Sequence, residues 1–150
     1  MKTIQELQEI VADRFEKANF VHHPAELYEP IDYALAQGGK RLRPVLTIAA
    51  CQMFGGDIED AINSAIGLEI FHNFTLLHDD IMDEAPIRRG KPSVYKKWNT
   101  NTAILSGDTM FVVAYDYVTE TKIEYLQPIL RLFNQTAKEV CEGQQFDMNF

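Results

Sequence analysis

Three aspartates within five residues are the clearest sign of chemistry in this chain. They close a long apolar stretch that has the periodicity of a helix. Because each helical residue turns by about 100°, Asp79 and Asp83 point the same way and Asp80 lies beside them. Carboxylates so close repel one another, and a bound cation removes that repulsion. Oxygen ligands suit Mg²⁺, which is often shared with substrate phosphates, so the segment predicts a site for Mg²⁺ and a diphosphate.

Two basic segments flank the acidic one in the sequence. Residues 40–43 follow Gly38 and Gly39, and residues 88–92 come shortly after Asp83. Glycines let a backbone approach a ligand closely, and Arg side chains bind phosphate oxygens with paired donors. Each basic segment alone could be solvated surface, and the aspartates alone could be a solvated helix end, although the helix dipole disfavours acid there. Together the three segments indicate a polyanionic ligand.

One histidine shares a helix face with the candidate metal ligands. His72 precedes Asp79 by seven residues, which is two helical turns. A histidine on an apolar face is more often a core residue than a ligand, and this alignment keeps both interpretations open. Leu68, Thr75 and Leu76 lie on the same face, so an apolar groove below the acidic end could hold a lipid-like tail. Ordinary core packing is the alternative.

Helices must position these residues, because the chain shows helical periodicity and no strand-like alternation of any length. We expect helices over residues 3–19, 24–37, 58–83 and 101–119, one that has Pro44 in its first turn and ends at Met53, a short turn at 93–98, and a last helix from Pro128 to the chain end. Asp57 is expected to cap the helix that carries the aspartates. The segment 101–119 is unusually apolar and should be central. The fold class is therefore all-α.

The composition of the 150 residues argues against several classes of protein. A hydrophobic share of 46% allows one domain with a real core. The net charge of −8 disfavours a nucleic-acid surface, which needs a basic stripe. Cys51 and Cys141 are far apart and do not have metal-site spacing, so free thiols in a reducing cytosol are expected. We find no signal peptide and no apolar run of the ~18 residues that a membrane span needs, so we expect a cytoplasmic protein.

The order and spacing of the motifs resemble those of the trans-isoprenyl diphosphate synthases, also called polyprenyl synthetases. The resemblance rests on five parts of the chain: residues 38–44, His72, residues 79–83, residues 88–90 and residues 143–147. These cover nearly the whole chain, and the set is specific although no single motif is. The resemblance implies an antiparallel helix bundle of the isoprenoid synthase type, of which residues 1–150 form the N-terminal portion.

The resemblance also implies a prenyltransferase that condenses an allylic diphosphate with isopentenyl diphosphate. Three carboxylates would bind the allylic diphosphate through Mg²⁺: Asp79, Asp80 and Asp83. Arg88 would hold the same diphosphate. The positions that match the isopentenyl diphosphate site are Lys40, Arg43, His72 and Arg89. Gln144 and Asp147 match residues close to the metals and the reacting carbons.

Product length in this family depends on residues just before the aspartate motif, which are Phe74 and Thr75 here. The small Thr75 lies one turn before Asp79 and leaves a deeper pocket than an aromatic residue would. On an ideal helix Phe74 points roughly 140° away from Asp79, so its effect does not follow from geometry. The resemblance implies a product near geranylgeranyl diphosphate, with farnesyl or longer chains as alternatives.

The chain departs from the family pattern in one respect. Family members are much longer and carry a second aspartate-rich motif in their C-terminal half, which is absent here. We therefore expect an incomplete enzyme that self-associates, as a homodimer, and has little or no synthase activity alone. The alternatives are a non-catalytic subunit of a heteromeric prenyl diphosphate synthase and a helical bundle that binds a divalent metal for stability. The three intact aspartates favour the enzyme over the non-catalytic subunit.

Overall fold

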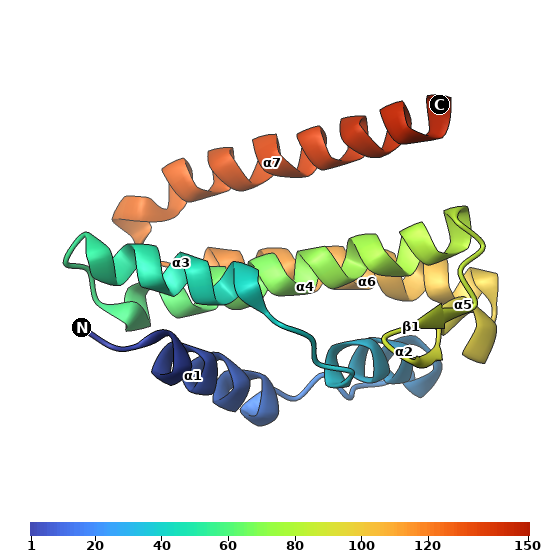
Figure 1. The fold of residues 1–150 in the computed structure, drawn as a ribbon, viewed down its shortest axis with the longest axis horizontal. Helices are drawn as coiled ribbons and strands as arrows, with labels where there is room; N and C mark the ends of the chain where they lie inside the picture. Colours follow the sequence, from blue (N-terminus) through green and yellow to red (C-terminus); the bar gives the residue numbers. More distant parts are fainter.

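The computed structural model describes all residues 1–150, which form seven helices and one short β-ladder (Figure 1). The helices are α1 (Ile4–Lys17), α2 (Ala25–Ala36), α3 (Leu42–Met53), α4 (Ile58–Met82), α5 (Val94–Lys97), α6 (Thr100–Thr119) and α7 (Ile123–Asn149). The ladder pairs β1 (Ile87–Arg88) with β2 (Lys91–Pro92) in antiparallel register. The expected all-α class is confirmed, and the only strands are two residues long, too short to show an alternating pattern.

Helices α4 and α6 run side by side through the centre of the molecule, and α3 packs on α4 (Figure 1). Ile66 and Ile70 of α4 and Met110 and Ala114 of α6 are almost completely buried between the helices. The expectation that residues 101–119 are central is confirmed. Gly67 permits the close contact, because a Cβ there would lie 2.8 Å from the Ala114 carbonyl oxygen.

Most helix ends lie within two residues of their expected positions. Asp57 caps α4 as expected, because its side chain accepts a hydrogen bond from the Glu59 N–H at 3.0 Å. The prediction for Pro128 was wrong: α7 begins at Ile123, and Pro128 lies inside it. Proline lacks an N–H, and the carbonyl four residues before it belongs to the exposed Glu124, where water can replace the missing donor.

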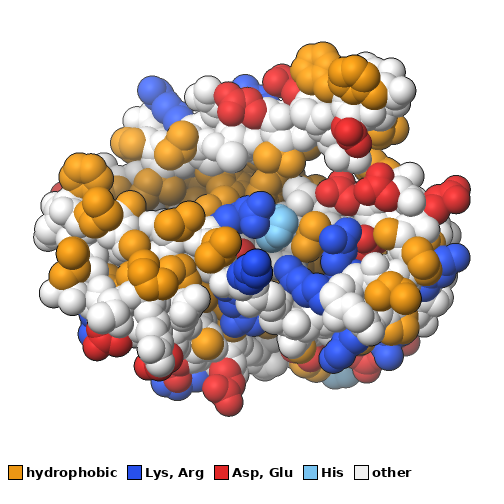
Figure 2. Space-filling view, viewed as in Figure 1, with side chains coloured by type: hydrophobic (Ala, Val, Ile, Leu, Met, Phe, Trp, Pro, Cys, Tyr) orange, Lys and Arg blue, Asp and Glu red, His pale blue; other side chains and the backbone are white.

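Helix α7 lies along one side of the α3–α4–α6 layer and brings the C-terminus to the end of the molecule where α4 ends (Figure 1). Phe133 and Ala137 are its only buried residues. Figure 2 shows a hollow with hydrophobic walls between α7 and the rest of the molecule. Large apolar side chains therefore stay exposed on α7, such as Leu132 at 67% and Phe146 at 67%.

None of the helices combines the length and hydropathy that crossing a membrane requires.

Candidate functional site

The three aspartates at the end of α4 occupy different environments. Asp80 is 3% exposed, and its Oδ1 accepts hydrogen bonds from Nη2 of Arg88 at 2.5 Å and from Nε of Arg88 at 3.1 Å. Asp79 is half-buried, and Asp83 is the exposed C-cap of the helix. Burial and the charge of Asp83 raise the pKa of Asp79, while Arg88 opposes that rise. Asp79 and Asp83 therefore repel each other, as expected for residues one turn apart.

The donor set fits a cation that is shared with a ligand, and not one that the protein encloses. No three acidic, His or Cys side chains converge as a complete metal site. Mg²⁺ is commonly bound by one or two carboxylates, with waters and substrate phosphates as the other ligands. Asp79 and Asp83 can supply those carboxylates, whereas the Oδ1 of Asp80 is already bonded to Arg88.

The second basic segment forms a tight hairpin beside the acidic end. Arg89 and Gly90 connect β1 to β2 with φ angles of 51° and 78°. Positive φ at both central residues matches the right-handed twist of a two-residue hairpin, and Gly90 adopts it without strain. The hairpin places Arg88 against Asp80 and brings Arg89 back toward α4, where its Nη1 donates to Oδ1 of Asn73 at 3.4 Å.

The first basic segment meets this hairpin at Gly39. A Cβ on Gly39 would lie 3.0 Å from Cζ of Arg89, so the guanidinium group would have to shift, and the φ of 125° would strain any other residue there. Arg41 anchors the segment on its other side: its Cζ lies 4.2 Å from the centre of the Phe15 ring, and its Nη2 donates to the Leu35 carbonyl at 3.2 Å. Gly39 thus lets the two basic segments approach each other, and Arg41 fixes the first of them to Phe15 and to the Leu35 carbonyl.

His72 lies where the basic residues meet. Its pKa is lowered to about 4 by burial and then by the positive charges of Arg43, Arg89 and Arg88, in that order. The imidazole is therefore neutral at pH 7 and can donate a hydrogen bond from one nitrogen only. Figure 2 shows Lys and Arg side chains gathered around a histidine in the middle of one face. This concentration of positive charge suits an anionic ligand.

The lowered pKa of His72 predicts a specific pH dependence of stability. The pKa of about 4 lies below the ordinary 6.5, so the unfolded chain binds the proton more readily as the pH falls. The free energy of unfolding should therefore fall between about pH 6.5 and pH 4. In His72→Gln this fall should be smaller by about 1–2 kcal/mol, after allowance for solvent screening. Urea unfolding of both chains at pH 7 and pH 4.5 measures it, and an equal fall in both would contradict the prediction.

The structure brings most of the expected site residues to one region. Charges on Arg43, Arg88 and Arg89 all act on His72, and Arg88 joins this group to the aspartates. Lys40 is exposed and lines a hollow with Gln8 and Ala12 of α1, and its neighbour Gly39 lies against Arg89.

Residues near the chain end approach the site from α7. Nε2 of Gln144 lies 3.7 Å from Sδ of Met82, so α7 passes close to the acidic end of α4. Asp147 is exposed, about one helical turn further along α7. Sequence reasoning missed Glu69 and Asn73, which are buried on α4 next to the basic segments. The sequence held one signal that could have pointed to them, because Glu69 is a charged residue inside an apolar helical run.

The two residues expected to affect product length face different surroundings. The ring of Phe74 stacks on Phe111 of α6, with centroids 5.1 Å apart and planes at 15°, and it also contacts Phe71 at 5.5 Å. Thr75 is half-buried and turns its hydroxyl back to donate to the His72 carbonyl at 2.7 Å. Phe74 thus packs between α4 and α6, as expected for a residue that points away from Asp79.

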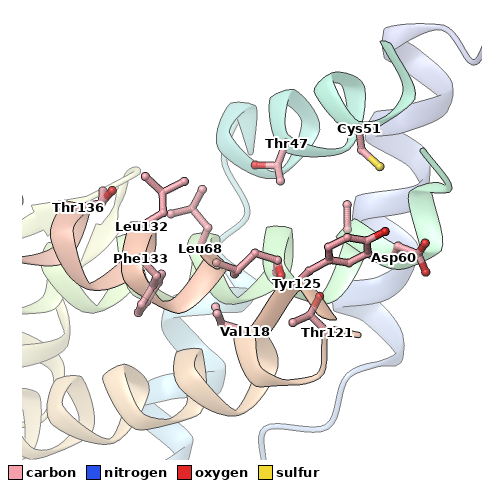
Figure 3. A pocket seen from close by; sticks show the side chains of 13 residues that line it. Thr47, Cys51, Asp60, Leu68, Val118, Thr121, Tyr125, Leu132, Phe133 and Thr136 are labelled. Carbon is pink, nitrogen blue, oxygen red and sulfur yellow. The ribbon is translucent and has the colours of Figure 1, made fainter. Parts of the chain in front are cut away.

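An apolar cavity of about 460 Å³ opens between α3, α4 and α7 (Figure 3). Its walls are made by Thr47, Cys51, Asp60, Ala61, Ser64, Leu68, Val118, Thr121, Tyr125, Ile129, Leu132, Phe133 and Thr136. Leu68, which was expected on the Asp79 face, is among them, and it lies about 16 Å from Asp79 along the helix axis. Phe133 connects the cavity to the aromatic rings of Phe71, Phe74 and Phe111, because its own ring lies 5.3 Å from that of Phe71. The cavity is suited to a hydrocarbon.

The chain resembles known proteins over most of its length. Residues 24–150 match the family model described as polyprenyl synthetase. The chain is 41% identical over 132 residues to the geranylgeranyl diphosphate synthase of Methanosarcina mazei, a match that covers 87% of this chain and 41% of the relative. It is 41% identical over 149 residues to the small subunit of the heterodimeric chloroplastic geranylgeranyl pyrophosphate synthase of Arabidopsis thaliana, covering 92% of this chain and 46% of the relative.

The fold has a close counterpart among solved structures. The structure of the geranylgeranyl pyrophosphate synthetase from the archaeon Geoglobus acetivorans matches with a TM-score of 0.92 and 38% identity. The match covers 99% of this chain and 49% of that one. The chain spans about half the length of the curated relatives that it matches. From the family match over residues 24–150, we conclude that the chain belongs to the polyprenyl synthetase family.

Proposed function

We propose that this chain carries the diphosphate-binding part of a prenyltransferase that condenses an allylic diphosphate with isopentenyl diphosphate. The observation that carries the proposal is the position of an open carboxylate pair, Asp79 and Asp83, beside a group of arginines that act on His72. One region thus offers ligands for a cation and donors for an anion. The synthase names of the relatives support the same activity.

The acidic end and Arg88 are proposed to bind the allylic diphosphate. Asp79 and Asp83 would hold Mg²⁺, with Asp80 near it, and Arg88 would bind the same diphosphate. When bound, Mg²⁺ supplies positive charge that stabilises diphosphate as a leaving group. The bond between the allylic carbon and oxygen breaks with its electron pair on diphosphate, and preorganised Arg donors stabilise that charge.

The diphosphate of isopentenyl diphosphate is proposed to bind among the basic residues around His72, which we call the basic centre. Its binding residues would be Lys40, Arg43, His72 and Arg89. Lys40 is exposed and follows Gly39, which lies against Arg89, and it would bind the diphosphate from there. The double bond of isopentenyl diphosphate attacks the allylic carbon, and the product loses a proton. Gln144 and Asp147 would lie near the reacting carbons, since Gln144 already contacts the end of α4.

The cavity between α3, α4 and α7 is proposed to hold the growing hydrocarbon. A dry, apolar wall also protects an allylic cation from water. The proposed product is of geranylgeranyl length, in agreement with the names of two relatives. Neither Thr75 nor Phe74 lines this cavity. Thr75 would leave the path from Asp79 open, and Phe74 would act on the cavity through Phe71, whose ring contacts Phe133 of the cavity wall.

Phe74→Ala is expected to lengthen the products of the complete enzyme. Removing the ring frees the space that it occupies beside Phe71 and Phe111, into which a longer chain can extend. Phe54→Ala is the matched control, because Phe54 is 91% exposed and does not belong to the group of aromatic rings around Phe74. Chromatography of products made from labelled isopentenyl diphosphate measures their length. An unchanged product distribution in Phe74→Ala would remove Phe74 from length control.

We also propose that the chain forms a homodimer and has little or no synthase activity alone. Helix α3 exposes a stripe of apolar side chains, with Leu42 at 52%, Leu46 at 63% and Met53 at 72%, in addition to those of α7. Monomers rarely expose apolar surface of this extent. A single monomeric species in sedimentation velocity would contradict the dimer.

A cytoplasmic location is proposed as well, and the two free cysteines are consistent with a reducing compartment.

Calorimetry with Mg²⁺ and inorganic pyrophosphate tests the proposed function. Mg²⁺ alone should bind weakly, and it should bind more tightly when pyrophosphate is present, because the phosphates complete its coordination. Asp79→Asn with Asp83→Asn should abolish this coupling, whereas Asp13→Asn, which changes an exposed acid on α1, should preserve it. Mg²⁺ affinity that ignores pyrophosphate would instead support a metal with a purely structural role. The non-catalytic subunit remains the alternative function, and turnover by the complete protein excludes it.

A further inference from the structure

Glu69 is a buried acid that the proposed reaction leaves without a role. It is 3% exposed within the apolar length of α4, and its Oε2 has no hydrogen-bond partner. Its Oε1 accepts only from Nδ2 of Asn73, at 3.4 Å. A buried carboxylate with so few partners costs free energy, so a local reason for its presence is expected.

Asn73 connects Glu69 to the basic centre. It is 4% exposed, and its Nδ2 donates to the Glu69 carbonyl at 2.8 Å as well as to the Glu69 carboxylate. Because both acceptors of the amide nitrogen belong to Glu69, the amide oxygen points the other way. That oxygen accepts from Nη1 of Arg89 at 3.4 Å. A continuous path of hydrogen bonds thus runs from inside α4 to the guanidinium group that Gly39 accommodates.

Three arginines from two segments surround Glu69. Burial raises the pKa of Glu69, and the charges of Arg43, Arg89 and Arg41 oppose that rise, in this order. None of the ion pairs in the structure involves Glu69, Arg43 or Arg89. Glu69 therefore offsets the repulsion among the arginines without occupying their donors. Arg41 donates to the Leu35 carbonyl and Arg89 to Asn73 through one nitrogen each, so Arg43 and the remaining donors of Arg89 are open to a ligand.

We propose that Glu69 and Asn73 are positioning residues for the basic centre, and that they orient Arg89 toward the diphosphate of isopentenyl diphosphate. Asn73 contacts Arg89 directly, and Glu69 acts through Asn73. This inference rests on the proposed function, because its ligand is a diphosphate of that reaction. It adds two residues, neither of which touches the substrate, to the set that sequence reasoning assigned.

The test measures the binding of inorganic pyrophosphate by calorimetry without added metal, which isolates the basic centre from the aspartates. Glu69→Leu should weaken binding about 10-fold, because the Asn73 amide keeps only the residue-69 carbonyl as an acceptor and its oxygen then holds Arg89 less firmly. Glu69→Gln keeps an acceptor oxygen for Asn73 and should bind at least as tightly as the unchanged chain. Tighter binding by Glu69→Leu would show that Glu69 only repels the anion, and would overturn the proposal.

A double-mutant cycle separates positioning from a general loss of structure. If Glu69 acts through Arg89, Glu69→Leu should have no further effect on binding in the Arg89→Ala background. A full and additive loss in that background would overturn the proposal. Asn73→Leu, taken through the same cycle, gives the second test if Glu69→Leu does not fold. Failure of the unchanged chain to bind pyrophosphate would count against the proposed function itself, whereas binding with additive losses would count against this inference alone.

Discussion

Arg88→Ala is expected to lower the free energy of unfolding by about 3 kcal/mol, the largest loss that we expect from any single side chain in the site. Asp80 is 3% exposed, and both hydrogen bonds that its Oδ1 accepts come from Arg88. Removing the arginine leaves a buried carboxylate without its partner, which costs more than the pair contributes. The Arg88 side chain is itself 33% exposed, so water can reach part of the gap and the loss should fall at the low end of the usual range.

Urea unfolding at pH 7 measures this loss, with two comparisons. Lys91→Ala removes an exposed basic side chain from the partner strand of the same hairpin and should change stability by less than about 0.5 kcal/mol. Adding Asp80→Asn to Arg88→Ala should recover much of the loss, because the buried charge is then gone. Equal stability of Arg88→Ala and Lys91→Ala would show that the buried pair contributes nothing.

The helices could be predicted from the sequence because their signals are local. The apolar spacing of α4, the Asp57 cap and the glycines that end α2 and α3 act over a few residues each. The prediction that a helix begins at Pro128 was wrong because it, too, used only a local signal. A proline marks a first turn when nothing else is known, but five more residues before it continue the helix in the structure. The hairpin at Arg89 and Gly90 could not be predicted. It depends on positive φ angles, and its two-residue strands are too short to give an alternating pattern in the sequence.

The candidate site was predictable where residues of a known motif lie on one helix or loop. The aspartates, His72 and the arginines were found in this way, and the structure brings them into one region. Glu69 and Asn73 were missed because they acquire meaning only when Arg89, sixteen residues after Asn73, folds back onto them.

Gly67→Ala is expected to destabilise the chain by about 2 kcal/mol, because it separates the two central helices. The added Cβ would lie 2.7 Å from Cγ2 of Val118 and 2.8 Å from the Ala114 carbonyl oxygen. Val118 could rotate, but the oxygen is part of the α6 backbone and moves only if the helix moves. The cost of this overpacking exceeds the gain of about 1 kcal/mol that alanine brings to a helix interior relative to glycine.

Gly143→Ala provides the matched control, since both glycines lie inside helices and receive the same methyl group. No atom lies within 4 Å of the Cβ position at Gly143. The helix-propensity gain is therefore unopposed there, and Gly143→Ala should stabilise α7, whose melting can be followed by circular dichroism. The two substitutions should thus have opposite signs. If Gly67→Ala were also stabilising, α4 and α6 would have to lie further apart in solution, and the support that they give to Phe74 and the aspartates would have to be reconsidered.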